Sequence, residues 1–317
     1  MTAPKIVVLG SVNIDLVIRA PKLPSPGETV LGGRFFEAPG GKGANQAVAA
    51  ARAARSPVAF VAAVGDDRYG QQSLDNFRRE GLLCEHLRIV PGEATGVALI
   101  LVDAEAENMI AVASGANAHL SIADVDHLPD SWFAPGGVLL ACLESPLPTV
   151  RHALARARVS GMTTILNPAP ASGPLPADVL ELVDVLTPNE HEAAALAGQS
   201  VTDHRSAVAA ARHLQQLGCR QVIVTRGSAG CTVMSDSIEG DEHGDGNAVD
   251  VPALAVQPVD TTAAGDAFNG ALAVKLSEGA SLVEAARWAS LAAAISVTRP
   301  GAQPSLPRRD EIDAAAK

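Results

Sequence analysis

Residues 260–270 read Asp260-Thr-Thr-Ala-Ala-Gly265-Asp266-Ala-Phe-Asn-Gly270 and follow a strand-like segment, Leu254 to Pro258. The run predicts the start of a helix. At this start the small residues Ala263, Ala264 and Gly265 let a ligand approach the backbone. Because the first N–H groups of a helix have no intrahelical partner and the helix dipole adds positive potential, an anion hole for a transferring phosphate is expected there. Asp266 either accepts a proton from a substrate hydroxyl or only complements the dipole.

A second glycine-rich run, Ala38-Pro-Gly-Gly41-Lys42-Gly43-Ala44-Asn45-Gln46, also leads into a predicted helix. Lys42 and Asn45 could donate hydrogen bonds to hydroxyl groups. The run is not a P-loop, since neither Ser nor Thr follows the lysine and the upstream glycine of that motif is missing. Without other signals, a loop that merely caps a helix is the alternative.

The first predicted strand ends in Gly10-Ser-Val-Asn13-Ile-Asp15, and open α/β sheets bind ligands at such strand ends. Asn13 and Asp15 would point the same way in an extended segment, although turn chemistry would also explain them. The dinucleotide fingerprint G-x-G-x-x-G is absent here, which argues against a dehydrogenase.

Three weaker signals can each be explained by a purely structural role. Asn189 and Glu192 at a helix start either hold a hydrated Mg²⁺ or form a capping pattern. The turn Thr225-Arg-Gly227-Ser228-Ala-Gly230 is either a nucleotide-binding turn or a simple hairpin. Glu144, after a central strand, either binds a hydroxyl or is a cap or turn residue.

Around these motifs, short apolar runs alternate with helical patterns. Strands are expected at 5–10, 58–64, 97–102, 109–113, 137–143, 162–166, 183–186, 221–225 and 230–234, and helices at 43–55, 70–80, 147–159, 203–217, 265–278 and 281–296. This alternation predicts a doubly wound α/β fold, a mostly parallel sheet with helices on both faces. We expect one domain, 1–317, with a small antiparallel β-sheet lid built from about 12–40 and 93–113. The acidic stretch 236–247 is expected to be a solvated hairpin loop.

Composition excludes several function classes. The net charge is −11, with one Tyr and two Trp, so the basic footprint of a nucleic-acid binder is missing. No run of 18 apolar residues predicts a membrane span, and no C-x-x-C pair occurs among the four cysteines. We therefore expect a cytoplasmic protein that binds small molecules rather than nucleic acid or membrane.

Taken together, the early Gly-Gly-Lys-Gly-Ala-Asn and the late Asp-Thr-x-Ala-Ala-Gly-Asp resemble the two signatures of the ribokinase and adenosine kinase superfamily of carbohydrate kinases. The resemblance covers nearly the whole chain, and Asn167-Pro-Ala-Pro170 is similar to ribose-specific members. It implies transfer of the ATP γ-phosphoryl to the 5-hydroxyl of D-ribose, with Mg²⁺ and K⁺ required, and a lid that also serves as a homodimer clasp.

The resemblance also implies a role for each matching residue. Asp266 would be the base, with the backbone N–H groups of Ala263, Ala264, Gly265 and Asp266 as the anion hole. The sugar would be held by Asn13, Asp15, Gly41, Lys42, Asn45 and Glu144. The nucleotide would contact Asn189, Thr225, Gly227, Ser228, Gly230, Gly265 and Ser290, and Glu192 would act on Mg²⁺ indirectly. The monovalent cation would be bound by Asp260, Thr262, Ser296, Arg299, Gly301 and Ser305.

Two positions depart from common patterns in that superfamily: Ala263 stands where many members have Gly, and Ser290 where a larger Asn or His often flanks the adenine. Alternative functions are a sibling kinase for deoxyribose, fructose or a nucleoside, and a sugar-binding regulator that has lost catalysis. Asp266 and the intact glycine run favour the enzyme, since binding alone requires no base.

Overall fold

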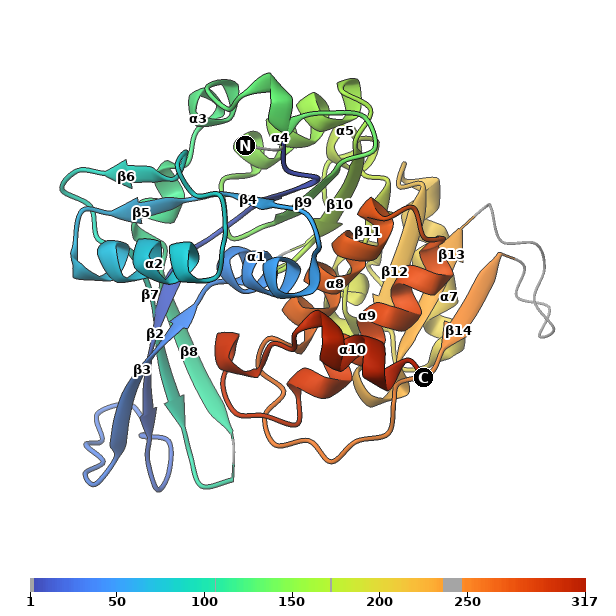
Figure 1. Cartoon of the computed structure of the whole chain (residues 1–317). Helices are drawn as coiled ribbons and strands as arrows, with labels where there is room; N and C mark the ends of the chain where they lie inside the picture. The colour runs from blue at the N-terminus through green and yellow to red at the C-terminus, as the bar shows by residue number, and fades with distance from the viewer. Residues whose placement is uncertain (1–2, 106, 172, 236–246) are drawn as a thin grey trace.

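The computed structural model describes residues 3–105, 107–171, 173–235 and 247–317. Its centre is an eight-stranded sheet (Figure 1). Across the sheet the strands follow the order β14 (Ala248–Val251), β13 (Cys231–Ser235), β12 (Gln221–Thr225), β11 (Val185–Leu186), β10 (Thr163–Asn167), β9 (Val138–Cys142), β1 (Ile6–Leu9) and β4 (Val58–Val61). From β12 to β4 all neighbours are parallel, while β13 and β14 pair antiparallel. The predicted, mostly parallel sheet is confirmed.

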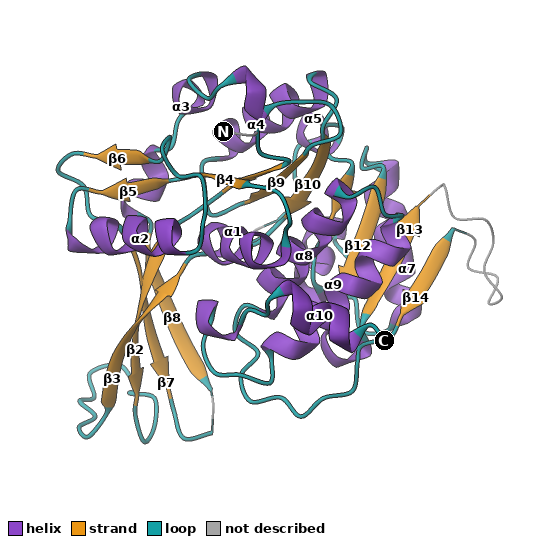
Figure 2. Ribbon diagram, in the orientation of Figure 1, coloured by secondary structure: helices purple, strands orange, loops and turns teal. Residues whose placement is uncertain are grey.

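Helices cover both faces of this sheet (Figure 2). Alternation along β1 shows why, because Ile6 and Val8 join the core on one face and Val7 and Leu9 the core on the other. The first face is covered by α1 (Lys42–Ala53), α2 (Arg68–Arg79), α8 (Ala264–Ser277), α9 (Leu282–Ser296) and α10 (Arg309–Ala315). The second is covered by α3 (Ile122–Asp126), α4 (Leu147–Val159), α5 (Ala177–Leu180), α6 (Glu190–Ala197) and α7 (His204–Gln216).

A separate four-stranded sheet projects from this body (Figure 1). Its strands follow the order β3 (Arg34–Gly40), β2 (Asn13–Arg19), β7 (Gly96–Val102) and β8 (Asn108–Ala113), and together they are called the lid sheet below. The outer pairs are antiparallel, whereas the central β2–β7 pair is parallel. It is built from the two segments that the sequence singles out.

The remaining elements are short. A parallel pair is formed by β5 (Ala63–Gly65) and β6 (Arg88–Val90), and the 3₁₀ turns are η1 (Gly115–His119), η2 (Asp130–Trp132), η3 (Gly227–Ala229) and η4 (Gln303–Ser305). All four cysteines are buried and free. No helix in the described ranges combines the length and the apolar character needed to cross a bilayer.

One predicted segment differs. Leu254 to Pro258 is not a strand: the sheet ends at β14, and residues 252–260 run as an irregular, largely exposed segment that begins at Pro252 and has no partner strand. This irregular segment lies along a cavity described below. The predicted loop 236–247 lies outside the described residues except for Asn247.

Candidate active site

The parallel strands bring several polar residues to one edge of the main sheet. Ser11 follows β1, Glu144 follows β9, Asn167 ends β10 and Thr187 follows β11. Because parallel strands present their carboxyl ends at the same edge, residues far apart in sequence meet there. The N-termini of α1 and α8 approach this edge and complete the site.

The lid sheet places Asn13 and Asp15 at its junction with the main body. Asn13 pairs with Gly40 across β2 and β3, and its Oδ1 accepts from Asn117 Nδ2 at 2.8 Å. The turn into α1 requires glycine at position 41, where φ is +90° and a Cβ would lie 2.7 Å from the backbone nitrogen of Asn13. This close approach sets the start of α1 directly beside Asn13.

Asp266 is buried in the first turn of α8, and both its carboxylate oxygens accept hydrogen bonds from α1. Asn45 Nδ2 donates to Oδ2 at 2.9 Å, and Gln46 Nε2 donates to Oδ1 at 3.0 Å. The two glycine-rich runs therefore meet at one carboxylate.

The electrostatics of this cluster suit a proton acceptor. Burial raises the pKa of Asp266 to about 6, although Lys42 and the amides of Asn45 and Gln46 act in the opposite direction. Burial, with the charges of Glu144 and Asp266, likewise raises the pKa of Asp15 to about 6. Burial by itself would lower the pKa of Lys42, but the negative charges of Asp266 and Glu144 outweigh it and raise that pKa. Lys42 is therefore a cation in the field of four carboxyl groups, Asp266, Glu144, Asp15 and Glu192.

Glu144 is held through one of its oxygens. Ser11 Oγ donates to Oε2 at 2.5 Å, and the backbone N–H of Lys42 donates to the same oxygen at 2.9 Å. The half-buried carboxylate thereby connects the end of β9 to the start of α1 and lines a cavity of about 380 Å³ with Asn13 and Asn117. It can still accept a hydrogen bond from a hydroxyl placed in that cavity.

The N-terminus of α8 offers unpaired donors. Ala263, the N-cap, has a φ of 61°, the only positive φ outside glycine among the described residues. Within the described ranges, the backbone N–H groups of Gly265 and Asp266 have no hydrogen-bond acceptor. A Cβ added at Gly265 would meet no atom within 4 Å, so the space in front of these N–H groups is open. This geometry suits an anion.

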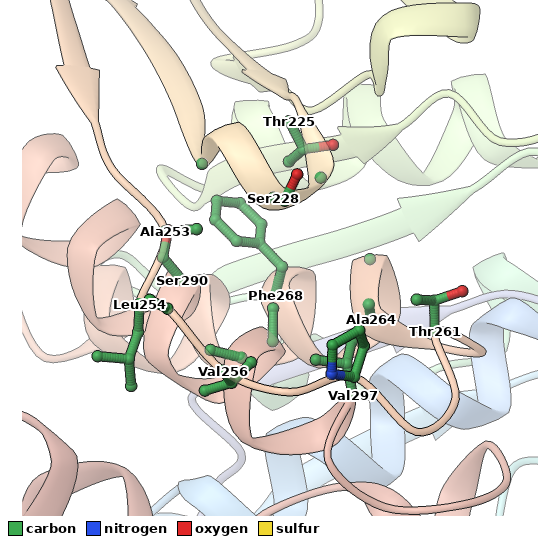
Figure 3. A pocket seen from close by; sticks show the side chains of 17 residues that line it. Thr225, Ser228, Ala253, Leu254, Val256, Thr261, Ala264, Phe268, Ser290 and Val297 are labelled. Carbon is green, nitrogen blue, oxygen red and sulfur yellow. The ribbon is translucent and has the colours of Figure 1, made fainter.

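Beside these donors lies a larger, mostly apolar cavity of about 480 Å³ (Figure 3). In that view Thr225, the last residue of β12, and Ser228, on the turn before β13, lie on one side, and Leu254, Val256 and Val297 lie on the other. The predicted residues that line it are Thr225, Gly227, Ser228, Gly230, Gly265 and Ser290. Ser290 Oγ donates to the carbonyl of Ala286 within its own helix, at 2.9 Å.

Asn189 and Glu192 form a reciprocal capping box at the start of α6. Asn189 Oδ1 accepts from the backbone N–H of Glu192 at 2.8 Å, and Glu192 Oε2 accepts from the backbone N–H of Asn189 at 2.9 Å. The capping alternative is thus realised. Burial raises the pKa of Glu192, against the influence of Lys42, which places this carboxyl in the same electrostatic field as the Asp266 cluster.

Asp260 links the segment before α8 to a loop near the C-terminus. Its Oδ1 accepts from the backbone N–H of Thr262 and its Oδ2 from that of Gly301, both at 2.9 Å. Arg299 pairs with Glu311 instead of Asp260. In the described part of the chain, no donor reaches the backbone carbonyls of Thr262, Arg299 or Gly301. Ser296 and Ser305 are buried, and their hydroxyls donate to nearby carbonyls.

Two groups of site residues carry no signal in the sequence. The apolar lining of the larger cavity, including Phe268, Val256 and Val297, carries no polar motif that would mark it. Gln46 and Asn167 also contact the Asp266 cluster from buried positions. Both lie within runs quoted above, but neither residue type at such a position indicates its partner.

The sequence and fold of this chain are similar to those of known carbohydrate kinases. The family model described as pfkB family carbohydrate kinase matches residues 3–309. A ribokinase of Haemophilus influenzae is 43% identical over 304 residues, covering 96% of this chain and 95% of the relative. A deoxyribokinase of Salmonella typhi is 36% identical, covering 97% of each.

Among solved structures, Arabidopsis thaliana ribokinase complexed with ribose and ATP superposes with a TM-score of 0.86 at 30% identity, covering 99% of both chains. The match to the family model over residues 3–309 and these relatives support the same assignment. The chain belongs to the pfkB family of carbohydrate kinases.

Proposed function

We propose that this protein transfers the γ-phosphoryl group of ATP to the 5-hydroxyl of D-ribose, giving ribose 5-phosphate and ADP. The observation that carries the proposal is the buried Asp266, with its pKa raised to about 6, beside unpaired N–H groups at the start of α8. A general base and an anion hole placed side by side are what phosphoryl transfer to a hydroxyl requires. The ribokinase relatives support ribose as the acceptor.

The sugar would occupy the cavity of about 380 Å³ between the lid sheet and the main sheet. Asn13 and Glu144 line this cavity. Asp15 on β2 and Lys42 and Asn45 at the start of α1 would supply further donors and acceptors for hydroxyl groups, and the Gly41 turn would bring the backbone close. Asp266 would take the proton of the 5-hydroxyl as that oxygen bonds to the γ-phosphorus and the bond from phosphorus to the β-bridging oxygen of ATP breaks. ADP then carries away the bonding electron pair.

ATP would lie in the larger cavity, with its base among the apolar side chains around Phe268 and its phosphates toward α8. The volume of about 480 Å³ and the apolar lining fit a purine. When bound, Mg²⁺ neutralises charge on the phosphates. Glu192, and Asn189 beside it, would interact with Mg²⁺ indirectly, through the water molecules that the ion holds. Gly265 and Asp266 supply the N–H donors for the transferring group.

A monovalent cation, K⁺, would bind between the Asp260 segment and the 296–305 loop. The free carbonyls of Thr262, Arg299 and Gly301 supply neutral oxygens, and Asp260 supplies one negative charge. Such a donor set fits a weakly charged ion better than Mg²⁺, which demands octahedral geometry and keeps bound water. Among the described residues, no group of three or more His, Cys, Asp or Glu side chains is placed to hold a metal.

The lid sheet would close over the sugar and pair with a second copy. On the face opposite Asp15, alternation places Ile18, Phe35, Leu99 and Met109, which are 39, 56, 56 and 53% exposed. An apolar face of this kind marks an interaction surface. A homodimer joined through the lid sheets would bury it.

The test is a coupled ADP-release assay of the purified protein with ATP, Mg²⁺ and a panel of D-ribose, 2-deoxyribose, fructose and a nucleoside. The proposal expects D-ribose to give the highest kcat/KM. A higher kcat/KM for 2-deoxyribose would favour the deoxyribose kinase that the Salmonella typhi relative suggests. Sugar binding without ADP release for any sugar would favour a regulator.

A further inference from the structure

A chain of buried hydrogen bonds leads from Asp266 through three neighbouring elements and back to α8. Gln46 Nε2 donates both to Asp266 Oδ1 and to Asn167 Oδ1, each at 3.0 Å. Asn167 Nδ2 in turn donates to the carbonyl of Thr187 at 3.0 Å. The path thus runs from the carboxylate to the ends of β10 and β11.

The path then returns to the first turn of α8. Thr187 Oγ1 donates to Asn269 Oδ1 at 2.6 Å, and Asn269 Nδ2 donates to the carbonyl of Gly265 at 2.8 Å. Since Gly265 precedes Asp266 in the chain, the backbone closes the loop. The donor and acceptor directions agree at every link, because each amide donates through nitrogen and accepts through oxygen.

Three members of this ring are buried more deeply than Asp266, which is 7% exposed. Gln46 is fully buried, and Thr187 and Asn269 are each 1% exposed. Burying a polar group costs free energy of desolvation unless the group is hydrogen-bonded. A buried network in which the polar groups are bonded to one another is rigid. Gln46 also leaves its Oε1 without a partner, so this side chain is oriented by its two donated bonds alone.

We propose that Gln46, Asn167, Thr187 and Asn269 are positioning residues that hold the Asp266 carboxylate and the N–H groups of the α8 first turn as one rigid unit. This inference rests on the proposed function, in which Asp266 is the base. Asn45 donates to Asp266 and is also expected to bind the sugar, whereas Gln46 donates to Asp266 and Asn167, both of them protein groups. The ring therefore keeps the base aligned with the anion hole independently of the sugar.

The sharpest test uses a link remote from the reacting atoms. Thr187→Val removes one hydroxyl of the ring and Thr187→Ser keeps it. Thr164→Val is the control, because Thr164 is equally buried and its hydroxyl bonds to groups outside the ring, namely the carbonyl of Leu182 and the carboxylate and N–H of Asp184. Both valine variants should lower the melting temperature, but only Thr187→Val should lower kcat, by about 10-fold, with the KM for ribose nearly unchanged. Misplacing reacting groups by about 1 Å can cost about 10²-fold, so a smaller shift fits this value.

Two variants at Gln46 test the same ring from the carboxylate. Gln46→Met should lower kcat about 10- to 100-fold. Gln46→Glu sets a second carboxylate against Asp266 and should move the acid limb of the rate profile up by about one pH unit or more. The other charged or titratable groups that act on Asp266, namely Lys42, Glu144, Asp15 and the thiol of Cys142, are unchanged in both.

A readout without turnover separates this inference from the function. In protein with ¹³C-labelled Asp carboxyls, the Asp266 resonance, identified by its loss in Asp266→Asn, should titrate at higher pH in Gln46→Met than in the wild type. Loss of a donor to the ionised carboxylate predicts that direction. Wild-type protein inactive on ribose counts against the function alone. An unchanged Asp266 titration in Gln46→Met, or equal kcat in the Thr187→Val and Thr164→Val variants, overturns the ring.

Discussion

The side-chain amide of Asn45 donates to Oδ2 of Asp266 at 2.9 Å, although 221 positions separate the two residues. This bond joins the starts of α1 and α8, the two helices that follow the glycine-rich runs. It explains why neither glycine-rich run indicates the site without the other. The run before α1 supplies donors, and the run before α8 supplies a carboxylate and an anion hole. A sugar hydroxyl that replaced Asn45 as the partner of Oδ2 would lie within reach of the proposed base.

The pH dependence of kcat/KM for ribose should show an acid limb near pH 6. A base acts only when ionised, and the pKa of Asp266 is raised from 3.8 to about 6, so activity is lost as pH falls through about 6. Asp15, whose pKa is also raised to about 6, titrates in the same range. Initial rates from pH 4.5 to 8 at constant ionic strength check this. Full activity at pH 4.5 would mean that no group with such a pKa is essential.

2-Deoxyribose should be a clearly poorer substrate than ribose, by about 10-fold or more in kcat/KM. A site built to hydrogen-bond a hydroxyl leaves buried polar groups unpaired when that hydroxyl is missing. Asp15 is the group expected to lose its partner, so Asp15→Ala should narrow the ratio between the two sugars while lowering both values. Equal kcat/KM for the two sugars in the wild type would speak against this assignment.

K⁺ should activate the enzyme and Na⁺ should not. A bound cation would fix the segment before Ala263 and so orient the N–H groups of α8, which predicts an effect on kcat or on phosphate affinity. Desalted protein is assayed in Tris chloride with K⁺, Na⁺ or neither at matched ionic strength. Asp260→Asn should weaken the K⁺ response, although it keeps a side-chain acceptor for the Gly301 N–H. The same rate in all three buffers excludes the site.

The lid sheet should hold two copies together. Light scattering after size exclusion should give twice the mass of the chain, and Leu99→Glu, which places a charge in the apolar face opposite Asp15, should shift the protein toward the monomer. Val159→Glu is the control, since Val159 is 90% exposed on α4 and lies outside the lid sheet. A wild-type monomer at micromolar concentration, or an unchanged dimer in Leu99→Glu, would contradict this interface.

Much of the architecture was predictable from the sequence because its signals are local. Apolar runs such as Ile6–Leu9 and Val138–Cys142 are buried on both faces and read directly as parallel strands. The strand predicted at Leu254 to Pro258 is wrong, since Leu254 and Val256 have a strand-like pattern but line a cavity. Short elements such as α3, α5 and β6 depend on their packing partners and carry too few residues for a periodic signal.

The site was predictable only where a backbone constraint marks it. Gly41 and the small residues before Asp266 stand out because few side chains fit there, whereas Gln46, Asn167 and Thr187 acquire their partners only when β10, β11, α1 and α8 come together. A glutamine in a helix has many possible partners, and no local rule chooses Asp266. Tertiary contacts decide this part of the site.

The central claim is that Asp266 acts as the base in phosphoryl transfer to ribose, and Asp266→Asn tests it most directly. The amide is nearly isosteric and keeps one oxygen that can accept from Asn45 or from Gln46, but it cannot accept the proton of the 5-hydroxyl. We expect kcat with ribose to fall by about 10²- to 10⁴-fold, while calorimetry shows ribose and ATP dissociation constants within a few-fold of the wild type. Near-native kcat in a variant that binds both substrates normally would contradict the account.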